Sequence, residues 1–267
     1  MYYKIRQIGI VFFSFLILST SSFAQSKSEK NSISDINLIN ITAKQKMLSQ
    51  RIAKDYLYIG KKVAVSKASR QLKKSLDEFI KTHEKLRKYI KDPDIKNLLD
   101  FVSLSSDDLK KTVNKKFSVD NAQLVLDLSE SMLEGNQYIV NSLKKSMKNK
   151  DSISIIGVVS QQRMLSQRIA KYYIAYQLGI KDKNSVKSMH DTVRKFNDNL
   201  NILMKNSTNT PQIDKKLAKI NKLWKIVYKF YNNIEKGGLP LIVFNTTDNI
   251  TKEMDEVTEM FLENEQL

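Results

Sequence analysis

Apolar residues recur at steps of three and four along most of the chain. One such series runs from Leu72 to Leu86, and another runs from Leu217 to Phe230. This spacing follows the 3.6-residue turn of an α-helix and differs from the alternation that is typical of strands. The pattern predicts an all-α protein.

Short breaks divide the pattern into eight expected helices. Asp92-Pro93 and Thr210-Pro211 each have the form of a capping residue followed by proline in the first helical turn. Glycines are expected to end helices at Gly60, Gly179 and Gly237-Gly238. The expected helices cover residues 34–59, 66–90, 94–115, 119–148, 152–178, 184–206, 212–236 and 239–265.

One ten-residue string occurs twice. Residues 45–54 read QKMLSQRIAK and residues 162–171 read QRMLSQRIAK, so the copies differ at one position and lie 117 residues apart. The same offset pairs Phe79 with Phe196, and it pairs the run 124–126 with the run 241–243. These correspondences predict an internal duplication of a four-helix unit.

Four amphipathic helices joined by short loops fold most readily as an antiparallel bundle. We therefore expect two tandem antiparallel four-helix bundles, in residues 25–149 and 150–267. The fourth and fifth helices are separated only by residues 149–151. If the chain turns there, the bundles lie side by side, and if it continues straight, they stack end to end. The Asp151-Ser152 start signal favours a turn.

The first 24 residues have the pattern of a secretory signal. Lys4 and Arg6 precede an apolar run of 11 residues, Ile8 to Leu18, and small residues lead to Ala24. The run is too short to cross a bilayer of roughly 30 Å as a helix. Cleavage is expected after Ala24, with an uncleaved anchor as the alternative. We expect a periplasmic or secreted protein whose mature chain has no transmembrane segment.

Charge and composition narrow the range of partners. The formal net charge of +17 becomes +15 without the two cations of the signal. Such a balance favours anionic partners, although lysines that only solvate helix faces are the alternative reading. Export argues against nucleic acid. The chain has no cysteine, so disulfides are excluded.

Little in the sequence indicates catalysis. The only histidines are His83, which falls on an apolar stripe, and His190, which has no obvious catalytic partners. Asp107-Asp108 and the acidic residues near the end of the chain have the pattern of solvated ion-pair faces. We expect no enzyme activity, no catalytic residues, no metal site and no cofactor.

Placed on a helix, the decamer has an apolar stripe and a polar remainder. Leu48 marks the stripe expected to face the bundle core, with Arg51 beside it and Lys46 nearly opposite. Arg168 and Arg163 take the same places in the second copy. A core stripe tolerates apolar exchanges, so packing alone does not account for the identical polar residues. Their retention suggests a contact surface or a ligand.

The decamer resembles the signature of the PilJ-type sensor domain. This domain is the amino-terminal ligand-binding module of type IV pilus chemotaxis transducers, and it is related to the periplasmic nitrate-sensing domain of the NarX and NarQ kinases. The resemblance rests on Arg/Lys-Met-x-Ser-x-Arg within residues 41–60 and 158–179. It implies a sensing role, a signalling partner and a non-catalytic bundle.

The resemblance also implies a ligand site. In the nitrate sensors the first basic residue of the motif points across a homodimer interface, and paired cations hold one small anion. The matching residues here are Lys46 and Arg163. Arg51 and Arg168 match the second motif arginine, which is expected to fix the helix. The predicted ligand-binding set consists of Lys46, Arg163, Arg51, Arg168, Gln50 and Gln167.

Two departures from the family pattern affect this prediction. Lys46 replaces an arginine, which exchanges a planar fork for a point charge. The family's receptors carry transmembrane helices and a signalling domain. We expect this chain to be a separate exported protein that signals through a membrane receptor or signalling protein. One hypothesis is therefore a sensor that binds a small, nitrate-like anion between its repeats. The alternative is a periplasmic adaptor or structural module that has no small ligand.

Overall fold

The computed structural model describes residues 34–145 and 151–264, which contain eight α-helices, one short 3-10 helix and no strand. The helices are α2 (Asp35–Gly60), α3 (Val65–Tyr89), α4 (Pro93–Val113), α5 (Val119–Lys145), α6 (Asp151–Gln177), α7 (Lys183–Met204), α8 (Pro211–Asn232), η1 (Ile234–Lys236) and α9 (Pro240–Asn264). The predicted all-α class is confirmed, and each predicted helix matches an observed one. The predicted signal, residues 1–24, lies outside the described residues.

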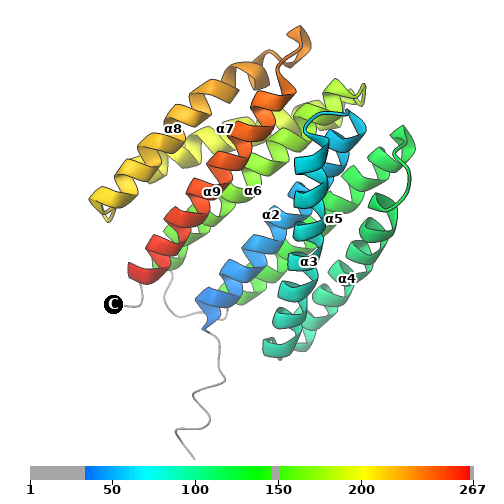
Figure 1. Cartoon of the computed structure of the whole chain (residues 1–267). Helices are drawn as coiled ribbons and strands as arrows, with labels where there is room; N and C mark the ends of the chain where they lie inside the picture. The colour runs from blue at the N-terminus through cyan, green and yellow to red at the C-terminus, as the bar shows by residue number, and fades with distance from the viewer. Residues whose placement is uncertain (1–33, 146–150, 265–267) are drawn as a thin grey trace, which may run out of the picture. The chain divides into compact units, whose positions relative to one another are not determined.

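The helices form two four-helix sets that meet along α2 and α6 (Figure 1). In the first set α2 packs on α3 and α5, and in the second α6 packs on α7 and α9. Lys61 Nζ donates to the Gln177 carbonyl oxygen at 2.6 Å, and this bond joins the carboxyl ends of the two motif helices. The sets therefore lie side by side, with α2 and α6 running in the same direction.

Two predicted caps begin the helices that carry proline in their first turn. The Asp92 carboxylate accepts hydrogen bonds from the backbone N–H groups of Asp94 and Ile95 at the start of α4. The Thr210 hydroxyl accepts from the backbone N–H of Ile213 at the start of α8. Each bond satisfies a donor that the first helical turn leaves free.

Helices end within two residues of Gly60, Gly179 and Gly237, as predicted. Gly179 and Gly237 have φ angles of +93° and +73°, which suit a residue just beyond a helix end. Gly60 is instead the last residue of α2. Its role is steric, because a Cβ there would lie 2.1 Å from Cε2 of the Phe117 ring.

The repeat offset changes by one residue between the second and third helices of each set. The buried pair Leu86 and Leu203 keeps the predicted offset of 117. From α4 and α8 onward, buried positions pair at 118, as Leu99 does with Leu217. The predicted pairing of 124–126 with 241–243 is therefore wrong by one residue, since the burial pattern pairs 124–126 with 242–244.

Candidate functional site

Both decamers are buried on nearly every side. Nine of the ten residues in each copy are buried, and Arg51 and Arg168 are half-buried. The cause is the central position of the motif helices, since α2 contacts α3, α5 and α6, while α6 contacts α2, α7 and α9. The side of each motif helix that the sequence placed away from its own core is covered by the other repeat. This contact accounts for the identical lysines that end the two decamers, Lys54 and Lys171, because each binds a carboxylate of the other repeat.

Two buried lysines cross from one repeat to the other. Lys54 Nζ lies 2.6 Å from the Asp248 carboxylate on α9, and Lys171 Nζ lies 2.5 Å from the Glu130 carboxylate on α5. Both lysine side chains are fully buried. The two pairs are equivalent in the duplication, because each joins the last residue of one decamer to the fourth helix of the other repeat.

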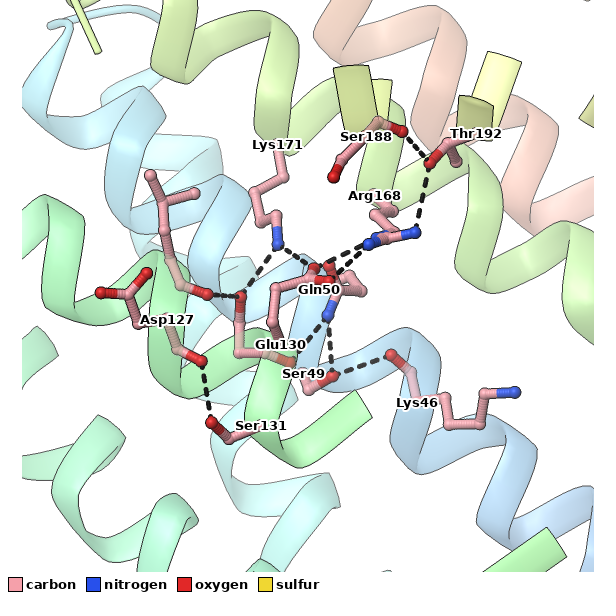
Figure 2. A network of polar contacts seen from close by, with 12 residues as sticks. Lys46, Ser49, Gln50, Asp127, Glu130, Ser131, Arg168, Lys171, Ser188 and Thr192 are labelled. Carbon is pink, nitrogen blue, oxygen red and sulfur yellow. Dashed lines mark hydrogen bonds and ion pairs between the residues drawn. The ribbon is translucent and has the colours of Figure 1, made fainter. Parts of the chain in front are cut away.

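Glu130 holds a second cation as well. Arg168 donates from Nε and Nη2 to its two carboxylate oxygens at 3.1 and 2.5 Å, as Figure 2 shows beside Lys171. Burial alone would raise the pKa of Glu130, but the charges of Lys171 and Arg168 outweigh it and lower the pKa to about 2. The carboxylate is therefore ionised at neutral pH and holds the Arg168 guanidinium in place.

Asp55, the residue after the first decamer, is fully buried with little compensation. Its carboxylate lies 3.3 Å from Lys54 Nζ and has no other polar partner among the described residues. Burial raises the pKa of Asp55 to about 7, while Asp248 acts in the same direction and the charges of Lys54 and Arg51 oppose the change. Asp55 is therefore about half protonated at pH 7 and favours its neutral form below that pH.

Gln50 and Gln167 each hold two helices of their own repeat together. Gln50 Nε2 donates to the Ser129 carbonyl oxygen on α5 at 2.9 Å. Gln167 Nε2 donates to the Thr251 hydroxyl on α9 at 2.6 Å. Each glutamine thus binds the fourth helix of its own repeat, and these contacts give it a structural role whether or not a ligand is present.

Arg51 lines a basic cavity of about 420 Å³ that is bordered by α2, α3 and, through Asp255, α9. Lys67, Arg70 and Lys74 also line it, together with the carboxylates of Glu78 and Asp255. Lys44 and Glu78 form an ion pair at the same cavity. Internal carboxylates therefore already offset part of its positive charge.

Arg163 has internal partners for its charge. Its side chain is 2% exposed. Nη1 donates to the Asp255 carboxylate at 3.0 Å, and Nη2 donates to the Asn40 side-chain oxygen at 2.7 Å. Asp255 belongs to the same repeat, whereas Asn40 lies on α2 of the other repeat. The structure thus gives Arg163 and Lys46 separate partners.

Lys46 lines a different cavity, of about 270 Å³, between α2, α5 and α6. Its side chain donates to the Gln137 side-chain oxygen, which is neutral. Lys144 and Ser160 also line the cavity, and no carboxylate does so among the described residues. Burial, followed by the charges of Lys144 and Arg168, lowers the pKa of Lys46 to about 8. We call this the Lys46 cavity.

The Ser160 hydroxyl gives the Lys46 cavity an unused polar group. The residue is 2% exposed, and its oxygen has no hydrogen-bond partner among the described residues. Buried polar groups are almost always hydrogen-bonded, so the unpartnered hydroxyl of a residue that lines this cavity with Lys46 and Lys144 is available to a polar guest.

The sequence prediction missed the residues on the fourth helices that bind the motif. These are Gln137 and Asp255, which hold the first motif cations, and Glu130 and Asp248, which hold the crossing lysines. Each of these two pairs has an offset of 118. A repeat offset of 117 applied to the whole chain hides these two pairs. Pro93 and Pro211, which lie 118 residues apart, indicate the correct offset for the second half of each repeat.

Comparison with known families agrees with this architecture. The family model described as "PilJ: Type IV pili methyl-accepting chemotaxis transducer N-term" matches residues 30–117 and 146–242. The two segments cover more than half of the chain, which therefore belongs to the PilJ family. The predicted resemblance is confirmed in two tandem copies, and it makes the protein a sensor-type signalling input domain. No match was found among curated proteins or solved structures.

The described residues, 34–145 and 151–264, contain neither a membrane-spanning helix nor a metal-binding cluster. No helix there is both long and apolar enough to cross a membrane. No group of histidine, cysteine and acidic side chains within the same ranges is arranged to hold a metal ion.

Proposed function

We propose that this protein is an exported, non-catalytic sensor module that binds a small anion between its repeats. It would pass the bound state to a membrane receptor or signalling protein. The supporting observation is the Lys46 cavity, where Lys46 and Lys144 contribute positive charge and no described lining residue contributes a carboxylate. Two cations held close together repel each other, so an anion between them relieves repulsion and accepts charge-assisted hydrogen bonds.

The family resemblance suggests an anion shared by Lys46 and Arg163. Arg163 already binds the Asp255 carboxylate, so an external anion would have to displace it. Lys46 has only the neutral Gln137 amide as a partner. The proposal therefore centres on Lys46.

A melting experiment tests the proposal. The purified protein is melted with nitrate, nitrite, phosphate or acetate at constant ionic strength. A ligand at about 100 times its Kd stabilises the folded state by about 2.7 kcal/mol, so we expect Tm to rise by roughly 5 °C or more with a cognate anion. Lys46→Gln should abolish the rise, whereas Lys85→Gln, an exposed site on α3, should keep it. If no anion changes Tm of the folded protein, the anion proposal is wrong.

Anion affinity should also depend on pH. An anion binds the charged form of Lys46, whose pKa is about 8 in the presence of Lys144 on α5 and Arg168 on α6. Affinity is thus full below pH 8 and falls as pH rises through it. For nitrate, which does not titrate in this range, we expect about tenfold weaker binding at pH 9 than at pH 7 by calorimetry. Lys46→Arg should reduce this pH dependence because arginine stays charged, and the remainder would come from Lys144, whose pKa burial also lowers. Equal affinity at both pH values in the unmodified protein would contradict the role of Lys46.

A second candidate function is an adaptor without a small ligand. Phe101 and Leu104 on α4 are 49% and 68% exposed, and Tyr138 on α5, the helix that packs on α4, is also exposed. Exposed apolar groups of this kind occur at protein contacts. In the adaptor case, Phe101→Ser would weaken partner binding while no anion would change Tm.

A further inference from the structure

The duplication places two equivalent junctions between the repeats. Each junction consists of the first motif cation, the fourth-helix residue that holds it, a second residue two turns further along that helix, and a residue of the facing motif helix. The first junction contains Lys46, Gln137, Lys144 and Gly157, and the second contains Arg163, Asp255, Leu262 and Asn40. Motif-helix residues correspond at an offset of 117 and fourth-helix residues at 118, which the burial pattern establishes.

The second junction is closed by its own side chains. The Asp255 carboxylate and the Asn40 amide oxygen both accept hydrogen bonds from Arg163, whose side chain is almost fully buried. The position that corresponds to Lys144 is the apolar Leu262, which is also buried. The charge of the arginine is therefore balanced inside the protein.

The first junction has a different residue at each of these positions, and each difference leaves more space or more positive charge there. Gln137 replaces the carboxylate with a neutral amide. Gly157 stands where the second junction has Asn40, so no side chain fills this place. The Lys144 ammonium lies close to it, since a Cβ on Gly157 would be 3.0 Å from Lys144 Nζ. Lys144 itself adds a positive charge in place of a leucine. The result is the Lys46 cavity.

We infer that the protein binds one small oxyanion per chain, at the first junction only, and that the Asp255 carboxylate takes the anion's place at the second. This inference rests on the proposed sensing function and specifies its ligand class, stoichiometry and residues. Lys46 and Lys144 would donate to the oxyanion, with the unpartnered Ser160 hydroxyl as a third donor.

The volume and donor set limit the size of the guest. A water molecule has about 30 Å³ of liquid volume, so the cavity of about 270 Å³ admits an anion of a few heavy atoms with some water. Ammonium groups donate hydrogen bonds without the fixed planar geometry of a guanidinium, so they bind planar and tetrahedral oxyanions alike. Nitrate and phosphate are therefore suitable probes of the two shapes.

Calorimetric titration with sodium nitrate and with sodium phosphate tests the inference. We expect the unmodified protein to bind one equivalent of at least one probe. Lys144→Gln should weaken that binding by about tenfold or more, because a charge-assisted hydrogen bond is lost. Lys145→Gln is the matched control, since this neighbouring lysine is exposed and does not line the cavity.

Combining Asp255→Gln with Asn40→Gly, which copies the first junction into the second, should add a second equivalent.

The outcomes separate this inference from the proposed function. Two equivalents in the unmodified protein would overturn the inference while anion sensing stands. The inference would also be overturned if one equivalent of anion still binds to Lys144→Gln but no longer binds to Arg163→Gln. If neither probe binds the folded protein, the inference falls, and the broader anion panel of the melting experiment decides the proposed function. Should the double variant fail to fold, Lys144→Gln against Lys145→Gln still decides, because Lys144 is only half-buried near the end of α5.

Discussion

Replacing Glu130 with glutamine is expected to lower the free energy of unfolding by about 3 kcal/mol. The substitution removes the carboxylate that balances two cations, of which Lys171 is fully buried and Arg168 is largely covered. A buried charge that loses its partner cannot recover the hydration it gave up on folding, so the folded state bears most of this cost. Urea denaturation at pH 7 measures the change.

Glu134→Gln provides the control for Glu130→Gln. Glu134 lies one turn further along α5, is exposed and undergoes the same chemical change, so its effect should stay below about 0.5 kcal/mol. The pH dependence adds a second test, because the pKa of Glu130 falls from 4.5 to about 2 on folding. Its stabilising effect is complete above pH 4.5 and disappears as the pH approaches 2. The difference in the free energy of unfolding between the unmodified protein and Glu130→Gln should therefore be smaller at pH 3 than at pH 7. An equal difference at the two pH values would contradict this explanation.

Asp55→Asn is expected to stabilise the protein, by about 2 kcal/mol at pH 8. The pKa of Asp55 rises from 3.8 to about 7 on folding, mainly through burial, so the folded state prefers the neutral carboxyl. The stability that this preference gives is complete below pH 3.8 and is lost as the pH rises through 7. Asparagine has a similar shape and never ionises, so the variant keeps its stability at high pH. Lys54 retains its ion pair with Asp248 in the variant.

Thermal melting at pH 5 and pH 8 measures the effect of Asp55→Asn. The gain in Tm should be small at pH 5 and larger at pH 8. Asp77→Asn on α3 is the matched control, since Asp77 is exposed and should change Tm little at either pH. A loss of stability at pH 8 would show that the ion pair of Asp55 with Lys54 outweighs the cost of burying the carboxylate.

The sequence predicted most of the fold because the helices have local causes. Three-and-four spacing, the Asp92 and Thr210 caps, and the glycines after α6 and η1 all act within a few residues of where they stand. The one-residue change of offset between the repeats has no local signature except the prolines. The steric role of Gly60 was not predicted because it depends on Phe117, a residue distant along the chain.

The candidate site was less predictable because it lies where two repeats meet. A helical wheel identifies one buried face, whereas the decamers have partners on nearly all sides. Arg163 has the same wheel position as Lys46, yet Asp255 balances the charge of one and only an amide holds the other. That difference depends on residues about 90 positions away, and the motif contains no trace of it.

Joining the two repeats in one chain has an evolutionary consequence. In a symmetric homodimer each substitution appears twice, so a site on the rotation axis is built from identical halves. A genetic fusion removes this restriction, because Gln137 and Asp255 are encoded separately and can diverge. One half can then specialise in recognition while the other becomes a permanent internal support, and their pairing no longer depends on how much protein the cell makes.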